Sequence, residues 1–372
     1  MPIIVVPPPK SINDSLFSLP TLLAFVFSLG LAIGSVAWLW FIKGRDFWFK
    51  RRFLFDKSAK QEIKPVGAHE TIVVEFSPPE KLRPAEMGTL MDERADTLDV
   101  SATIVDLATR GYLIVAEEPK KWLFGNADYV LTKKSKDTKE LLGYEKELFE
   151  RLFNEGDLVK ISSLKTKFYK DLKVVKEKLY KEVVNKNFFP ENPESVKNKY
   201  IFIGVGVIIL GAVFLVLGFN IINNLLVGAG AGLLIGGGFW FLFARLMPRR
   251  TAVGREMYRR AAGYELFVSS AEKYRQRFFE KKNMFNEILP YAIVFGLTEK
   301  FAKAFKEMGV EPVQPSWYSG SAPFNAALFG ASIANFSGSL SSAMAAAPGG
   351  SGFSGGGGFS GGGFGGGGGG SW

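Results

Sequence analysis

The side chains able to do chemistry in this chain are few in kind. The sequence has no cysteine and a single histidine, His69. Disulfides, thiolate metal sites, cysteine nucleophiles and clusters of histidine ligands are therefore excluded. His69 stands just before an apolar stretch, where a lone histidine is more often a surface or structural residue than a catalytic one.

Neither carboxylates nor glycine-rich loops indicate a catalytic site. The chain has 36 Asp and Glu, but catalytic carboxylates need a shared cleft, and no spacing indicates one. Glycine-rich loops hold phosphate groups at a strand-to-helix turn. Gly236-Gly237-Gly238 lies inside an apolar segment instead, and no helix follows the glycines of 349–372. We therefore predict a protein that is not an enzyme, with no catalytic, cofactor-binding or metal-binding residues and no cofactor.

The basic residues suggest a different chemistry. The chain carries 46 Lys and Arg and a net charge of +10. A helix predicted at 163–187 has an apolar stripe, and lysines populate the rest of its surface. That face is either solvated or a surface for anionic lipid headgroups or an acidic partner, since a basic residue near an anionic membrane contributes about 1 kcal/mol. The lysines are Lys165, Lys167, Lys170, Lys173, Lys176, Lys178 and Lys181.

The apolar segments that must position these residues are long. Residues 200–244 contain no Asp, Glu, Lys, Arg or His. A helix crosses about 30 Å of hydrocarbon with about 20 residues, so this segment fits two spans and a turn. The asparagines of 220–224 mark the turn. We predict a hairpin of transmembrane helices at 200–219 and 225–244.

A third span precedes the hairpin. Residues 15–42 carry no charge, and aromatic residues gather at their C-terminal end as in a membrane-interface belt. We predict a transmembrane helix at 19–42, after a short external N-terminus at 1–18. A cleaved signal peptide fits less well, because the apolar run is too long and no small-residue cleavage site follows it.

Basic residues lie on one side of all three spans. They follow the first span and stand at both outer ends of the hairpin, and the hairpin turn has none. The positive-inside rule then places the N-terminus outside, and the C-terminus and both soluble segments in the cytoplasm. The predicted location is the plasma membrane. The flanking residues are Lys43, Arg45, Lys50, Arg51, Arg52, Lys197, Lys199, Arg245, Arg249, Arg250 and Arg255.

The soluble segment 43–198 has the element order of a winged helix. Pro84 can begin one helix, Asp99 can cap a second, and Gly111 suits the exit from it. Helix, helix, strand, loop and strand then follow one another, so we predict an α+β winged-helix-like domain. Its elements are a strand at 71–76, helices at 84–92 and 100–110, and strands at 112–116 and 129–132.

Further helices complete the two soluble segments. Helices are predicted at 139–153 and, after a cap at Ser162, at 163–187. The second cytoplasmic segment, 245–318, is predicted to be helical at 251–282 and again from Pro290 to about 308. The uncharged residues 319–372 are predicted to form a Gly-rich flexible tail. Within it, apolar residues at intervals of four allow a weakly amphipathic helix at 324–344 that lies on the membrane interface.

The spans themselves offer packing surfaces and no transport pathway. Carriers and channels tend to place ionisable groups in their spans, and these spans have none. Their many glycines indicate close helix packing. That packing occurs either within the hairpin or through self-association or contact with another membrane protein.

Several stretches together resemble one family. They are 76–88 (FSPPEKLRPAEMG), 99–113 (DVSATIVDLATRGYL), 289–292 (LPYA) and the Gly-rich end with Ser371-Trp372. Their order around three spans is similar to that of the YciQ-like group, bacterial predicted membrane proteins of unknown function. Such proteins usually carry a signal sequence and an extracytoplasmic β-rich domain before the first span. Only 1–18 stand in that place here, which implies a shortened member or a start inside a longer frame. The group has no established activity, so the resemblance implies no catalytic residue.

The expected fold is a mainly α membrane protein with three transmembrane helices, a cytoplasmic winged-helix-like domain and a second cytoplasmic helical segment. The favoured function is a scaffold or signalling component that docks protein partners. The alternative is a membrane-tethered nucleic-acid-binding regulator, and a small transporter component is a weaker one. Nucleic acid is disfavoured as a partner because a recognition helix needs basic or amide side chains facing solvent. Helix 100–110 offers Ser101, Thr103, Asp106, Thr109 and Arg110.

Overall fold

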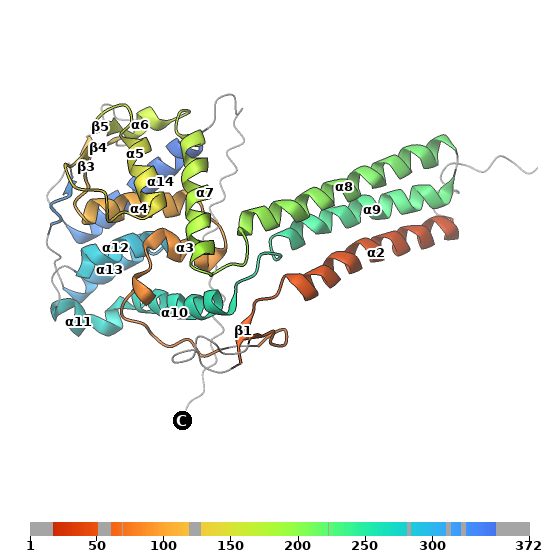
Figure 1. Ribbon diagram of the computed structural model, residues 1–372, viewed down its shortest axis with the longest axis horizontal. Helices are drawn as coiled ribbons and strands as arrows, with labels where there is room; N and C mark the ends of the chain where they lie inside the picture. The colour runs from red at the N-terminus through yellow and green to blue at the C-terminus, as the bar shows by residue number, and fades with distance from the viewer. Residues whose placement is uncertain are drawn as a thin grey trace, which may run out of the picture. The chain divides into compact units, whose positions relative to one another are not determined.

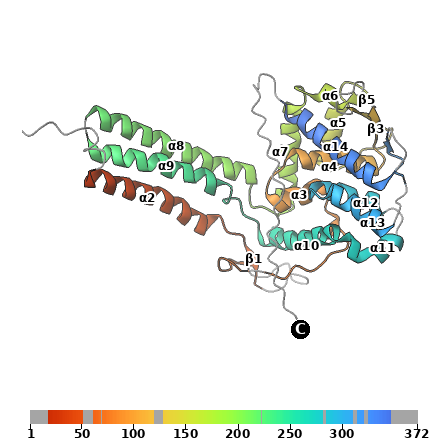
Figure 2. The same ribbon diagram turned by 180° about the vertical axis from the view of Figure 1, so that it is seen from behind.

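The computed structural model describes most of the chain (Figures 1 and 2). The described residues are 18–50, 61–68, 70–118, 128–221, 223–280, 284–309, 314–320 and 325–346. Residues 1–17 of the predicted external N-terminus (1–18), His69, and the Gly-rich residues 347–372 lie outside them.

The chain divides into two units. Met1–Glu70 and Val183–Met257 form the first, here called the membrane unit, and Thr71–Glu182 and Tyr258–Trp372 form the second, here called the globular unit. The division differs from the expected series of separate domains. Parts of the two predicted soluble segments belong to one unit, although the hairpin separates them in sequence.

The three predicted spans are helices, and all are long and apolar enough to cross a membrane. They are α2 (Leu19–Lys43), α8 (Pro193–Asn220) and α9 (Asn224–Ala244). α8 begins before the expected boundary because Asn192 caps it and Pro193 suits its first turn. Asn223 caps α9 by accepting hydrogen bonds from the N–H groups of Leu225 and Leu226, so the turn lies in the predicted asparagine segment.

Glycines on two faces of α9 bring the spans together. Gly228, Gly232 and Gly236 face α2, where a Cβ on Gly232 would meet Ser28 Oγ and lie 2.5 Å from the carbonyl oxygen of Phe25. Gly230 faces α8, and a Cβ there would lie 2.7 Å from the carbonyl oxygen of Gly211. α9 therefore runs beside both α2 and α8, as Figures 1 and 2 show. These glycines serve packing within the chain.

Aromatic side chains pack the three spans against one another at the end where their basic flanking residues lie. Val36 of α2, Tyr200 of α8 and Trp240 of α9 belong to one buried cluster with Ala244 and Met247. The rings of Tyr200 and Trp240 stack with centroids 6.3 Å apart. Beyond this cluster, β1 (Trp48–Phe49) pairs with β2 (Gln61–Glu62) in a short antiparallel hairpin.

The first half of the globular unit has the predicted order of helix, helix, strand and strand. Its elements are α3 (Pro84–Asp92), α4 (Thr97–Thr109), β3 (Leu113–Glu118) and β4 (Asp128–Lys133). β3 and β4 are antiparallel, with Val115 opposite Leu131. A short helical turn, η2 (Pro79–Lys81), precedes α3.

Two details of this half were predicted wrongly. Residues 71–76 are not a strand, since their recorded backbone bond goes to a helix: the N–H of Glu75 donates to the carbonyl of Gly263. The cap of α4 is Asp96, which accepts from the N–H groups of Leu98 and Asp99. In turn, the Asp99 carboxylate accepts a hydrogen bond from the N–H of Asp96 at 2.9 Å. Both carboxylates thus belong to one capping box, and the helix begins three residues earlier than predicted.

The helices that follow are shorter than predicted. They are α5 (Gly143–Leu152), α6 (Ile161–Leu164) and α7 (Tyr169–Asn185), with β5 (Leu158–Lys160) between α5 and α6. The single helix predicted at 163–187 is interrupted at Thr166, whose positive φ of 66° leaves the right-handed helical region. β5 pairs with β4, and β6 (Tyr318–Ser319) pairs with β3, so the sheet order is β5-β4-β3-β6.

The second half of the globular unit supplies most of its other helices. They are α10 (Ala252–Ser269), which belongs to this unit from Tyr258 onward, η3 (Ala271–Tyr274), α11 (Arg275–Glu280), α12 (Met284–Val294) and α13 (Thr298–Met308). Pro290 lies inside α12 and does not begin a helix. The helix predicted from there to 308 breaks at Gly296, which has a φ of +66°.

Residues 326–345, part of the predicted flexible tail, form a helix close to the amphipathic one that the spacing at 324–344 allowed. β6 (Tyr318–Ser319) pairs in parallel with β3, and α14 (Ala326–Ala345) packs on α4, α6 and α13. The apolar stripe of α14 is buried in the unit, so it does not serve as a surface for the membrane interface. Its members are Phe329, Ile333, Phe336, Leu340 and Met344.

α4 lies at the centre of the globular unit. Every residue from Asp99 to Ala108 is buried, because α3, α12 and α14 pack around the helix (Figure 1). The core therefore joins residues near 100 to residues near 290 and 335. In sequence, the transmembrane hairpin stands between these two groups.

We predict that Gly232→Ala weakens the membrane unit and that Gly238→Ala does not. A Cβ at Gly232 meets the backbone of α2, whereas nothing lies within 4 Å of one at Gly238. Overpacking costs about 1–3 kcal/mol, while alanine in an open helical position gains up to about 1 kcal/mol over glycine. Thermal unfolding in detergent should show a lower midpoint for Gly232→Ala only. Equal midpoints for the two variants would contradict the α2–α9 packing.

Candidate functional site

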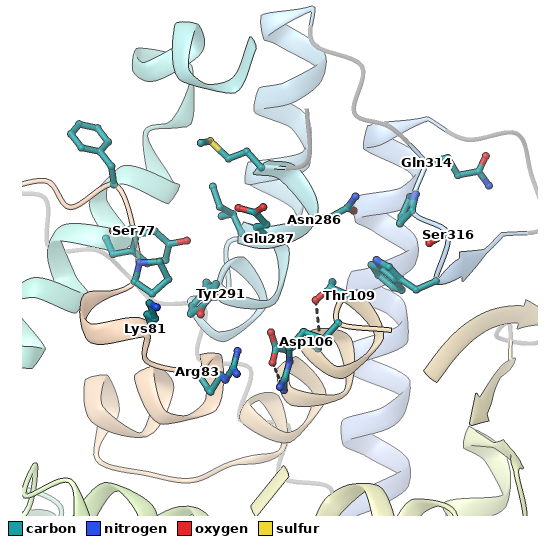
Figure 3. A pocket seen from close by; sticks show the side chains of 18 residues that line it. Ser77, Lys81, Arg83, Asp106, Thr109, Asn286, Glu287, Tyr291, Gln314 and Ser316 are labelled. Atoms are coloured by element: carbon teal, nitrogen blue, oxygen red, sulfur yellow. Dashed lines mark hydrogen bonds and ion pairs between the residues drawn. The ribbon is translucent and has the colours of Figure 1, made fainter. Parts of the chain in front are cut away.

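A cavity of about 870 Å³ opens in the globular unit (Figure 3). Residues 76–83 form one wall, the C-terminal end of α4 forms the floor, and α12 and residues 314–317 form the other walls. The cavity therefore draws on both halves of the unit. The polar side chains labelled in Figure 3 are Ser77, Lys81, Arg83, Asp106, Thr109, Asn286, Glu287, Tyr291, Gln314 and Ser316.

An ion network forms the floor of this cavity. Arg110 Nη2 lies 2.7 Å from an oxygen of Asp106 and 2.6 Å from Glu145 Oε1. Arg83 Nε lies 3.6 Å from the same Glu145 oxygen. Glu145 is fully buried, and Asp106 is nearly so. Two guanidinium groups and two carboxylates thus balance one another in a region of low dielectric, where an unpaired charge would be costly.

Burial shifts the titration of the carboxyl that faces the cavity. Removal from water raises the pKa of Asp106 from 3.8 to about 6; Arg110 opposes the rise and Glu145 adds to it. Burial also raises the pKa of the nearby Tyr144 hydroxyl. Asp106 is therefore the cavity group whose charge responds to mildly acidic pH.

A backbone turn of unusual conformation carries Lys81 and Arg83 to the cavity wall. Glu80 and Lys81 have φ values of 49° and 56°, a left-handed region that costs roughly 1–2 kcal/mol per non-glycine residue. The hydroxyl of Tyr291 on α12 donates to the carbonyl of Leu82 at 2.8 Å. α12 thus holds the turn in place, and strain of this kind is often found at binding sites.

The remaining walls are aromatic. Phe76 meets Phe267 and Tyr274 edge to face at 5.3 and 5.2 Å, and the Arg277 guanidinium lies 3.8 Å from the centre of the Phe76 ring. Tyr264 meets Tyr291 at 5.3 Å. These contacts fix the wall before any ligand arrives.

Several polar atoms at the cavity have no hydrogen-bond partner within the described part of the chain. They include Asn286 Oδ1, Trp317 Nε1 and Arg110 Nε. A buried polar atom left unpaired costs about 1–3 kcal/mol. The polar side chains that a ligand can reach are the exposed Ser77, Gln314 and Ser316, which line the cavity beside its aromatic rings.

The structure does not support the assumption that helix 100–110 turns the predicted polar residues to solvent. Ser101, Thr103 and Asp106 are buried, because α12 and α14 cover α4. Thr109 and Arg110 reach the cavity. The sequence analysis counted these two among the side chains that make the helix a poor base-recognition surface, and in the structure they line the cavity.

The lysine face at 163–187 is partly neutralised. Lys178 pairs with Glu147, and Lys167 lies 3.7 Å from Glu155. The cavity residues of α12 and 314–317 were not singled out from the sequence. The only signal there was the LPYA stretch, which includes Tyr291.

We predict that Asp106 lowers stability as pH rises through about 6. The folded protein holds the Asp106 proton more tightly than the unfolded chain does, so this stabilising effect is complete below about pH 3.8 and is lost above about 6. The loss amounts to up to about 3 kcal/mol, at about 1.4 kcal/mol per pKa unit. In thermal unfolding between pH 4 and 7, the midpoint of Asp106→Asn should rise relative to that of the wild type.

The exposed Asp137 gives a matched control, and Asp137→Asn should follow the wild-type curve. Parallel curves for Asp106→Asn and the wild type would contradict the assignment.

Comparison with known proteins gives a family. Residues 73–305 match the family described as "Predicted membrane protein (DUF2207) C-terminal domain". No curated protein and no solved structure matches the chain. The matched region includes α8 and α9, two walls and the floor of the cavity, and most of the stretches that resemble the YciQ-like group, a resemblance that the match supports. The chain belongs to this family of predicted membrane proteins.

Proposed function

We propose that this protein is a scaffold or signalling component whose globular unit docks a protein partner in the cavity, and that it is not an enzyme. The membrane unit anchors it, and the basic residues flanking the spans favour a cytoplasmic position for the globular unit. The observation that carries the proposal is the cavity itself, because it combines preformed aromatic walls with exposed polar side chains.

The composition of the cavity is typical of a protein interface. Tyr, Trp and Arg dominate the energetics of such interfaces when they line a pocket that excludes water. Tyr264, Trp317 and Arg83 provide these residue types here. The Arg83 side chain is one-third exposed, and its ion pair with Glu145 is 3.6 Å long. It can therefore accept an acidic side chain of a partner without breaking a short ion pair.

Docking is favoured over catalysis by the state of the carboxylates. A general base must reach a substrate proton at hydrogen-bond distance. Asp106 and Glu145 are both held by Arg110 at 2.7 Å or less. Their arrangement supports a structural floor better than a pair of reacting groups.

A nucleic-acid-binding function has weaker support. The order of α3, α4, β3 and β4 is that of a winged helix, which is the observation in its favour. In such domains the second helix enters the DNA major groove. α4 would have to do so here, and its surface is covered by α3, α12 and α14.

We predict that a photo-crosslinking amino acid at Gln314 or Ser316 captures the same partner in native membranes. Both side chains are exposed at the cavity. The same probe at Lys300, exposed on α13 away from the cavity, is the control and should give no such adduct. The adducts should have one common mass on denaturing gels.

A blocking variant makes the test specific. Ser77 is exposed and lines the cavity, so Ser77→Trp should lower the adduct yield by at least about tenfold, or 1.4 kcal/mol of binding. Ser163→Trp places the same side chain at an exposed position on α6 and should leave the yield unchanged. If the yield is equal in both variants, or if the Lys300 probe gives the same adduct, the docking proposal fails.

A further inference from the structure

The chain leaving α2 runs beside the chain leaving α9 in the membrane unit. The N–H of Arg250 donates to Asp46 Oδ1 at 2.7 Å, and the N–H of Phe47 donates to the carbonyl of Arg250 at 3.1 Å. These bonds hold two segments side by side just past the ends of the helices. Each segment brings arginines to this place.

Asp46 forms ion pairs with some of these arginines, but not with all of them. Its Oδ2 lies 3.6 Å from Nη1 of both Arg250 and Arg255. Arg45 and Arg249, each one residue from the Asp46–Arg250 bond, have no carboxylate within 4.0 Å among the described residues. Their positive charges are therefore not neutralised by an ion pair in that part of the chain.

Aromatic rings hold both of these guanidinium groups. The Arg45 Cζ lies 4.7 Å from the centre of the Phe41 ring, and the Arg249 Cζ lies 4.7 Å from the centre of the Phe47 ring. Stacking on a ring leaves the edge of a guanidinium group free to donate hydrogen bonds. Arg45 also donates from Nη2 to the carbonyl of Lys64, which further limits its motion.

The position of these arginines is that of lipid headgroups. α2 ends at Lys43 and α9 at Ala244, and both helices are apolar up to these ends. Trp38 and Phe41 are more than half exposed near the end of α2, as expected for an aromatic belt at the membrane interface. Arg45 and Arg249 follow the helix ends by a few residues, which is where phosphates lie when such helices span a bilayer.

We propose that Arg45 and Arg249 bind the phosphate groups of anionic phospholipids at this end of the spans. Guanidinium groups suit phosphate because they donate two parallel hydrogen bonds. Each basic residue near an anionic surface adds to the electrostatic attraction. This inference concerns the membrane unit alone and does not depend on docking at the cavity. It assigns lipid contact to the ends of α2 and α9, whereas the sequence had suggested the lysine face at 163–187.

The test uses the intact chain in nanodiscs made from phosphatidylcholine and phosphatidylglycerol. Lipid that stays with the protein after transfer to mild detergent is quantified by mass spectrometry. The wild type should retain phosphatidylglycerol in excess of its share of the bilayer. The double variant Arg45→Gln/Arg249→Gln should lose this enrichment by at least about fivefold, the equivalent of 1 kcal/mol.

Two further variants separate a lipid site from a general effect of charge. Lys170→Gln/Lys173→Gln removes two exposed lysines of α7 and should retain wild-type enrichment. Arg45→Lys/Arg249→Lys keeps the charge and should show an intermediate loss, because lysine cannot donate the paired bonds. Thermal midpoints in phosphatidylcholine alone check that each variant is folded.

Inorganic phosphate at the same ionic strength as a chloride control distinguishes the source of the phosphate. Phosphatidylglycerol should stay bound in both buffers. Displacement by phosphate alone would assign the site to free phosphate and overturn the proposal. It would equally be overturned if a folded Arg45→Gln/Arg249→Gln variant kept full enrichment, or if the α7 variant lost as much.

Discussion

The burial of α4 is the constraint on which the globular unit depends. A helix enclosed on all sides must satisfy its polar groups internally. α4 does so through the capping box of Asp96 and Asp99 and through side chains that bond back to its own carbonyls: Ser101 to Thr97, and Thr103 to Asp99, both at 2.8 Å. Gly88 of α3 leaves room for the Asp99 carboxylate, which a Cβ there would meet. With its polar groups satisfied in this way, α4 can accept neighbours on every face.

Those neighbours come from both sides of the transmembrane hairpin. α3 precedes the hairpin, and α12 and α14 follow it. The cavity forms where they meet, since α4 ends in the Asp106–Arg110 pair and α12 and residues 314–317 close over it. A site made in this way requires both soluble segments to be present. The proposed docking function therefore depends on segments that precede the transmembrane hairpin and on segments that follow it.

The sequence predicted best what composition alone decides. The spans followed from the absence of charge, and α3 followed from its proline start. The sequence predicted less well what distant contacts decide. Residues 71–76 have the composition of a strand, but the N–H of Glu75 bonds to the carbonyl of Gly263 on α10. The residues of α14 carry no charge, which is the composition of a flexible tail. Its buried stripe has a partner, α4, more than 200 residues earlier. No local pattern shows such a partner, so the cavity could not be predicted either.

Hydrogen–deuterium exchange of the intact protein tests most directly whether residues after the hairpin complete the core around α4. Peptides from 329–344 in α14 should exchange as slowly as peptides from 100–108 in α4, because the two helices are protected by the same contact. Exchange of 329–344 within seconds, with 100–108 still protected, would contradict a core shared by the two halves.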